Sequence, residues 1–91
     1  MRVAQREWIF LLPAEQIVIE IKKTRSSLKT RDIGEQLIID TAHYQAHPDC
    51  KALVAFVYDP EMIVDNPRGL EKDLSGQKSG IYVQVLIFPR I

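Results

Sequence analysis

The sequence is poor in the residue types that mark several classes of protein. A single cysteine, Cys50, among 91 residues excludes an internal disulfide framework and is typical of a reducing cytoplasm. The four glycines do not have the spacing of a phosphate-binding loop. No apolar run approaches the ~20 residues that a membrane-spanning helix needs, and residues 1–8 show no signal peptide. We therefore expect a cytoplasmic protein that does not bind a membrane.

The sequence also has no net charge. Twelve basic and twelve acidic side chains cancel, so a nucleic-acid partner can be indicated only by local clustering. A hydrophobic fraction of 46% and a charged fraction of 26% are ordinary for a globular protein. A chain of this length has interior for one core, so residues 1–91 are predicted to form one domain.

Hydrophobic periodicity predicts an α/β domain with a mixed sheet of about four strands and two helices, in the order β-β-α-β-α-β. Asp32 is a plausible N-cap for the first helix, and Asn66 followed by Pro67 is an N-cap signal for the second. The third strand is almost continuously apolar, which favours an interior strand covered on both faces. The expected strands cover residues 8–12, 16–22, 51–59 and 81–88, and the expected helices cover residues 33–47 and 68–75.

The second strand carries a pair of opposite charges. Successive strand side chains alternate between faces, so Glu20 and Lys22 project together into a shared hollow, away from Ile17, Ile19 and Ile21. A carboxylate can bind Mg²⁺, and a nearby lysine can orient or deprotonate water or stabilise a phosphoryl transition state. An ordinary solvated ion pair, worth ~0–1 kcal/mol, is the alternative.

Longer segments support the first interpretation. Residues 17–25 read Ile-Val-Ile-Glu-Ile-Lys-Lys-Thr-Arg, residues 34–40 read Gly-Glu-Gln-Leu-Ile-Ile-Asp, and residues 66–74 read Asn-Pro-Arg-Gly-Leu-Glu-Lys-Asp-Leu. With these segments the chain, over about residues 9–88, resembles the C-terminal part of bacterial PD-(D/E)xK (restriction-endonuclease-like) nuclease domains. The resemblance implies a DNA substrate and a Mg²⁺ cofactor, with Mn²⁺ as a possible substitute.

The resemblance also implies residue roles. Glu20 matches a metal ligand, Lys22 matches the catalytic lysine, and Gln36 and Tyr44 match auxiliary helix positions near the active site. On the helix Gln36 belongs to a polar stripe that is expected to face a cleft or a partner, and the stripe also contains Asp40, His43 and His47.

The chain departs from the family at the first acidic ligand. That ligand belongs about eleven residues before Glu20, where this chain has Ile9. Glu7 lies two residues before Ile9 on the same strand face. This separation of ~6–7 Å is far longer than a ~2.1 Å Mg–O bond, so Glu7 is not expected to replace the missing ligand. The core of the superfamily also begins with a helix and an edge strand for which this chain has no room. We expect an impaired nuclease; the alternative is a non-catalytic remnant that oligomerises through an exposed sheet edge or binds DNA.

Residues 22–31 contain five basic side chains and no acidic one. Lys23, Arg25 and Lys29 are the candidates for contacts with DNA phosphates, and an ordinary solvated loop is the alternative. Trp8 and Tyr58 could stack on bases, but their strand-like surroundings favour core packing.

His43 and His47 have the spacing of a helical zinc pair, although the sequence shows no third ligand. Surface or cleft histidines are the interpretation that we favour. Cys50 lacks partners for a catalytic triad and is expected to be a small buried hydrophobe.

Overall fold

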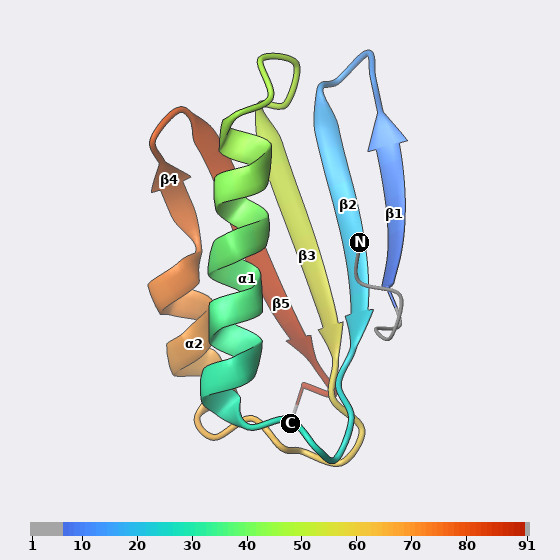
Figure 1. Cartoon of the computed structure of the whole chain (residues 1–91), viewed down its shortest axis with the longest axis vertical. Coiled ribbons are helices and arrows are strands. Elements are labelled where there is room, and N and C mark those ends of the chain that lie inside the picture. Colours follow the sequence, from blue (N-terminus) through green and yellow to red (C-terminus); the bar gives the residue numbers. More distant parts are fainter. Residues whose placement is uncertain (1–6, 91) are drawn as a thin grey trace.

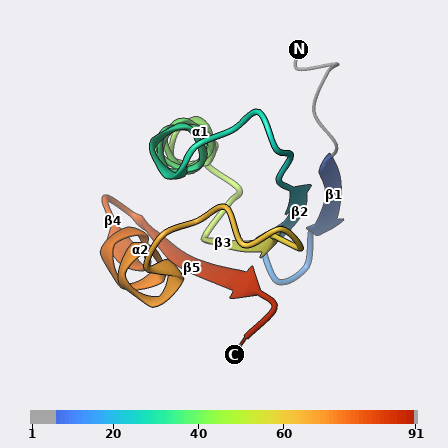
Figure 2. The same cartoon turned by 90° about the horizontal axis from the view of Figure 1, so that it is seen from below.

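The computed structural model describes residues 7–90. It consists of a five-stranded mixed sheet, a long helix α1 that crosses one face, and a short helix α2 beside strand β5 (Figures 1 and 2). The elements are β1 (Glu7–Leu12), β2 (Ile17–Lys23), α1 (Thr30–Gln45), β3 (Ala52–Tyr58), α2 (Pro67–Leu74), β4 (Gly76–Lys78) and β5 (Ile81–Phe88). The α/β class and the order of the predicted elements are confirmed.

The strands lie in the order β1-β2-β3-β5-β4. The three central strands are parallel, because each of β2 and β3 is followed by a helix-containing crossover, whereas β1 and β4 pair antiparallel at the two sides. The carboxyl ends of β2, β3 and β5 therefore meet at one end of the sheet (Figure 1). The basic segment after β2 lies at that end.

The core lies between α1 and one face of the sheet. Ile33 and Leu37 of α1 are fully buried against alternate residues of the parallel strands. The strand residues of this core are Val18, Leu53, Ala55, Val57, Ile81, Val83, Val85 and Ile87. Their strict alternation confirms the strand periodicity that the sequence predicts.

The opposite face of the sheet corrects one prediction. The third strand was expected to be covered on both faces, but Ala52, Val54 and Phe56 are half-buried and Tyr58 is exposed. Trp8 is also exposed, so the prediction that Trp8 and Tyr58 pack in the core is wrong. The reason is that α1 covers only the other face.

Both ends of helix α1 and one strand differ from prediction, since a helix was expected over residues 33–47 and α1 covers Thr30–Gln45. Helix α1 begins at Thr30, so Asp32 lies in its first turn, where its carboxylate accepts a 2.9 Å hydrogen bond from the Lys29 backbone N–H. Strand β4 was not predicted, because three residues that follow a helix carry no periodic signal. The predicted cap of α2 is confirmed, since Asn66 Oδ1 accepts a hydrogen bond from the Gly69 N–H.

None of the helices in residues 7–90 is long and apolar enough to cross a membrane.

Candidate active site

The predicted pair on β2 forms as expected but is not open to solvent. Lys22 Nζ lies 3.5 Å from Glu20 Oε1, and both side chains point from the sheet toward α1. Glu20 is 1% exposed and Lys22 is 3% exposed. The shared face is therefore confirmed, whereas the expected open hollow is replaced by a buried cluster under the helix.

A third charged residue completes this cluster. Asp40 of α1 is 4% exposed, and its Oδ2 lies 3.0 Å from Lys22 Nζ. The ammonium is thus held by two carboxylates from two elements, in a low-dielectric interior where such contacts are stronger than in water. We call Glu20, Lys22 and Asp40 the buried charge cluster. The helix periodicity placed Asp40 on a polar stripe, but it did not show that Asp40 turns inward while His43 and His47 stay exposed.

The two predicted auxiliary residues lie along the same side of α1 as Asp40. Gln36 precedes Asp40 by four residues and Tyr44 follows it by four, so the three side chains occupy successive turns of one helix face. Both Gln36 and Tyr44 are half-buried. The Tyr44 ring packs against His43, with ring centroids 4.8 Å apart.

The position of the family's first acidic ligand is defined by strand register. Ile9 pairs directly with Glu20 across the antiparallel β1–β2 ladder. Directly opposed residues share a face and have Cβ atoms ~4.5–5.5 Å apart. A carboxylate at residue 9 would therefore stand beside Glu20. Glu7 pairs with Lys22 instead, and its side chain lies outside the described part of the structure.

Comparison with known families agrees with this assignment. The model of the DpnII-MboI restriction endonuclease family matches residues 3–90. The chain belongs to this family. No curated protein and no solved structure matches the chain. The match confirms the PD-(D/E)xK resemblance and identifies a nuclease-like domain of a family that acts on DNA.

Restriction endonucleases generally use a divalent metal, so we tested whether this DpnII-MboI domain could hold one. Mg²⁺ takes octahedral oxygen ligands and keeps several waters. Here the two candidate carboxylates, Glu20 and Asp40, are buried and joined by the Lys22 ammonium, which already supplies the positive charge. Over residues 7–90, no three His, Cys, Asp or Glu side chains gather at a position for a metal. Because both carboxylates are buried and contact Lys22, this arrangement leaves them no open position for a hydrated Mg²⁺ or Mn²⁺.

A cavity of about 400 Å³ lies toward the other end of β2 in the DpnII-MboI domain, and Glu20, Lys22 and Asp40 are not among its lining residues. It opens between the β1–β2 hairpin and the C-terminal end of α1, and its lining includes Ile9, Val18, Tyr44 and Cys50. The residues that line the cavity are mainly apolar. Cys50 is buried, which confirms the expectation from the sequence. Burial raises the pKa of the Cys50 thiol, because a thiolate is poorly solvated there.

The predicted DNA-contact residues of the DpnII-MboI domain are all on its surface. Lys23 at the end of β2, and Arg25 and Lys29 on the connection from β2 to α1, are exposed. The connection is anchored from within by buried Thr24, whose Oγ1 donates a 2.8 Å hydrogen bond to Asp59 Oδ1. Sequence reasoning missed this anchor, because a threonine and an aspartate 35 residues apart form no local pattern.

Proposed function

We propose that this chain is an impaired DNA endonuclease domain of the DpnII-MboI family. It keeps the carboxylate and the lysine of the second strand, but it lacks the first acidic ligand. The observation that carries the proposal is the direct pairing of Ile9 with Glu20. An aliphatic side chain occupies the position beside Glu20 at which the family resemblance calls for an oxygen ligand.

The state of Lys22 also supports impaired catalysis. A catalytic lysine must contact water or the phosphate, but Lys22 Nζ is held 3.0 Å from Asp40 Oδ2 and is almost completely buried. A phosphodiester in solution therefore has no route to the ammonium without movement of α1. We expect Mg²⁺- or Mn²⁺-dependent cleavage by this chain to be absent or very weak.

A plasmid-cleavage assay with Mg²⁺ and with Mn²⁺ tests this proposal. Wild type is expected to leave supercoiled plasmid intact. Ile9→Asp, which adds a carboxylate beside Glu20, is expected to nick it slowly, because the substrate still reaches Lys22 only when α1 moves. Leu11→Asp is the matched control, because it adds the same group on the same strand face opposite Val18. Ile9→Asp combined with Lys22→Ala is expected to lose the gained activity.

Two results would contradict the proposal. One is cleavage by the wild type as fast as by Ile9→Asp. The other is a gain of activity in Leu11→Asp as large as in Ile9→Asp, because the position of the new carboxylate would then be irrelevant.

A non-catalytic DNA-binding role is the second candidate. It is favoured by the exposure of Lys23, Arg25 and Lys29 on a single connection of a neutral chain. Surface cations of this kind bind the phosphate backbone without reading the base sequence. Such a role needs neither a metal nor access to Lys22.

A further inference from the structure

The connection from β2 to α1 contains the same three residues twice. Residues 23–25 and residues 29–31 both read Lys-Thr-Arg. In each copy the threonine is the most buried of the three, and the lysine and the arginine beside it are exposed. We call residues 23–31 the connection strip. The strip therefore turns two threonines toward the protein and four cations toward its surface.

Both threonines are hydrogen-bonded to the loop that follows β3. Thr24 Oγ1 donates to Asp59 Oδ1 at 2.8 Å. Thr30 Oγ1 accepts the Asp65 N–H at 2.9 Å and donates to the Ile63 carbonyl oxygen at 3.4 Å. The two copies of the tripeptide are thus attached to one loop, more than 30 residues further along the chain.

The Asp59 carboxylate organises both attachments. Its side chain is buried, and besides Thr24 it accepts the backbone N–H groups of Ile63 at 3.0 Å and of Val64 at 2.9 Å. These bonds fold the loop whose Ile63 carbonyl oxygen is the acceptor for the second threonine. One buried side chain therefore fixes the first threonine directly and the second through the loop.

The surface side of the connection strip consists of hydrogen-bond donors. Its exposed residues are Lys23, Arg25, Ser26, Ser27, Lys29 and Arg31, and none of the six is acidic or apolar. Leu28, the apolar residue of the strip, packs against the hydrophobic core. Lysine, arginine and serine side chains are among the groups that contact the phosphates of DNA. The outward side of the strip is therefore suited to a polyanion.

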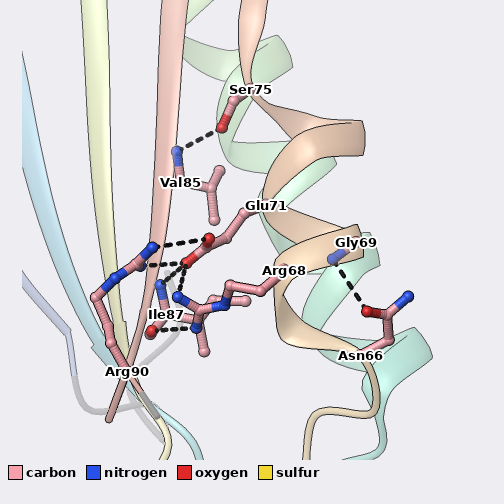
Figure 3. A network of polar contacts seen from close by, with 8 residues as sticks. All are labelled: Asn66, Arg68, Gly69, Glu71, Ser75, Val85, Ile87 and Arg90. Atoms are coloured by element: carbon pink, nitrogen blue, oxygen red, sulfur yellow. Dashed lines mark hydrogen bonds and ion pairs between the residues drawn. The ribbon is translucent and has the colours of Figure 1, made fainter.

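Arg68 of α2 and Arg90 after β5 are held in a different way (Figure 3). Arg90 contacts the Glu71 carboxylate at 2.7 Å, and Arg68 lies 3.4 Å from it and donates to the Ile87 carbonyl oxygen at 2.8 Å. Glu71 also accepts the Ile87 N–H at 2.6 Å, and Ser75 Oγ accepts another N–H of β5 at 2.9 Å. Because Glu71 offsets part of their charge, these two arginines are poorer ligands for a phosphate than the cations of the strip.

We propose that the connection strip is an ordered site for successive phosphates of a DNA backbone, with Arg31 as a further contact residue and Asp59 as the positioning residue. This inference rests on the proposed DNA-binding role and adds the groups that fix its geometry. Cations that are held in place before binding lose less conformational freedom when they bind, so the affinity is higher than for the same cations on a mobile loop. Asp59 contributes in this way without contacting DNA.

Fluorescence anisotropy with a labelled DNA duplex at several salt concentrations separates contact from positioning. Arg31→Ala is expected to reduce the slope of log K against log salt by about 0.9, because one phosphate contact is lost. Arg68→Ala is the matched control, since it removes the same side chain and charge from a residue that is held by Glu71. It is expected to leave the slope unchanged.

The two threonines test the positioning. Thr24→Val and Thr30→Val keep every charge and each removes one hydroxyl. Each is expected to weaken binding about three- to tenfold with the slope of wild type, because the cations are still present but must be ordered on binding. Thr24→Ser keeps the hydroxyl and is expected to bind as wild type does. Thr41→Val, at a half-buried position of α1, is the matched control.

Asp59→Asn tests the positioning residue itself. Removal of a negative charge would by itself strengthen binding to DNA. The amide also replaces one of the two acceptor oxygens by a donor, which disrupts the loop, so we expect weaker binding in spite of the charge change. Circular dichroism establishes that each variant is folded.

Two outcomes would overturn the inference. One is an Arg31→Ala variant whose salt slope equals that of Arg68→Ala. The other is a pair of valine variants that bind DNA as tightly as Thr41→Val. If wild type still binds through Lys23 and Lys29 in these cases, the proposed DNA-binding role stands without the inference. A wild type that does not bind duplex DNA would overturn both.

Discussion

Ile9 stands directly opposite Glu20 in the β1–β2 ladder, on the same sheet face as the buried charge cluster, and its own side chain is 48% exposed. The family's missing acidic position is thus next to a retained carboxylate.

Ile9→Asp is expected to bind Mn²⁺. The added carboxylate would join Glu20 and Asp40 near a single ammonium, and the excess negative charge beside these buried carboxylates favours a divalent cation. Isothermal titration with Mn²⁺ measures this, with no binding expected for wild type or for Leu11→Asp. Binding by wild type that Glu20→Ala leaves unchanged would place the metal elsewhere.

Lys22→Met is expected to lower the free energy of unfolding by about 3–5 kcal/mol, because it leaves two carboxylates buried without their cation. Urea denaturation followed by circular dichroism measures the change. Lys23→Met is the matched control, because Lys23 is exposed, and it should change the free energy by less than about 0.5 kcal/mol. Adding Asp40→Asn to Lys22→Met should recover part of the loss. Equal effects at residues 22 and 23 would show that the buried charge cluster does not stabilise the fold.

Exchanging Lys23 and Lys29 for alanine is expected to weaken binding to duplex DNA and to reduce the salt dependence of the affinity. Each lost phosphate contact changes the slope of log K against log salt by about 0.9, so two contacts change it by about 2. Fluorescence anisotropy at several salt concentrations measures the slope. A variant in which Lys51 and Lys72 become alanine has the same change of net charge and uses equally exposed residues. If both variants gave the same slope, the connection after β2 would have no special role.

Stability is expected to fall at alkaline pH because of Cys50. Desolvation raises the pKa of its thiol above the usual value of 9.0, so the folded state favours the neutral form. The thiol's contribution is therefore fully present below the usual pKa and is lost as pH rises through the pKa of the folded state. Urea denaturation at neutral and at alkaline pH should show a smaller decline for Cys50→Ala than for wild type. Identical declines would contradict this assignment.

The faces of individual strands could be predicted from the sequence, but what covers each face could not. Because side chains alternate between the two faces of a strand, the sequence predicts that Glu20 and Lys22 share one face, and the structure confirms this. Their burial depends on how α1 is packed on the sheet, which is a tertiary property. The same limit explains Trp8 and Tyr58, because an apolar strand has the same sequence pattern whether its second face is covered or open.

Asp40 illustrates a second limit. A carboxylate between apolar residues of a helix is compatible with a solvated stripe or with a buried ion pair, and only the position of Lys22, 18 residues away, decides between them. Local cap signals act within one turn; the prediction is confirmed at Asn66 but wrong at Asp32, because the N-cap of α1 is Lys29. Strand β4 was missed for the converse reason, since it is defined by its neighbour β5 rather than by its own three residues.

The carboxylate of Glu71 and the hydroxyl of Ser75 also bear on the solubility of a protein with so much apolar surface. A cross-β filament grows only if each subunit offers a free margin on both sides. Along the part of β5 that β4 does not reach, α2 occupies this margin, so two copies that met through β1 would leave only the three residues of β4 as a free edge. Helix α2 therefore shortens the free edge through which such a filament could grow.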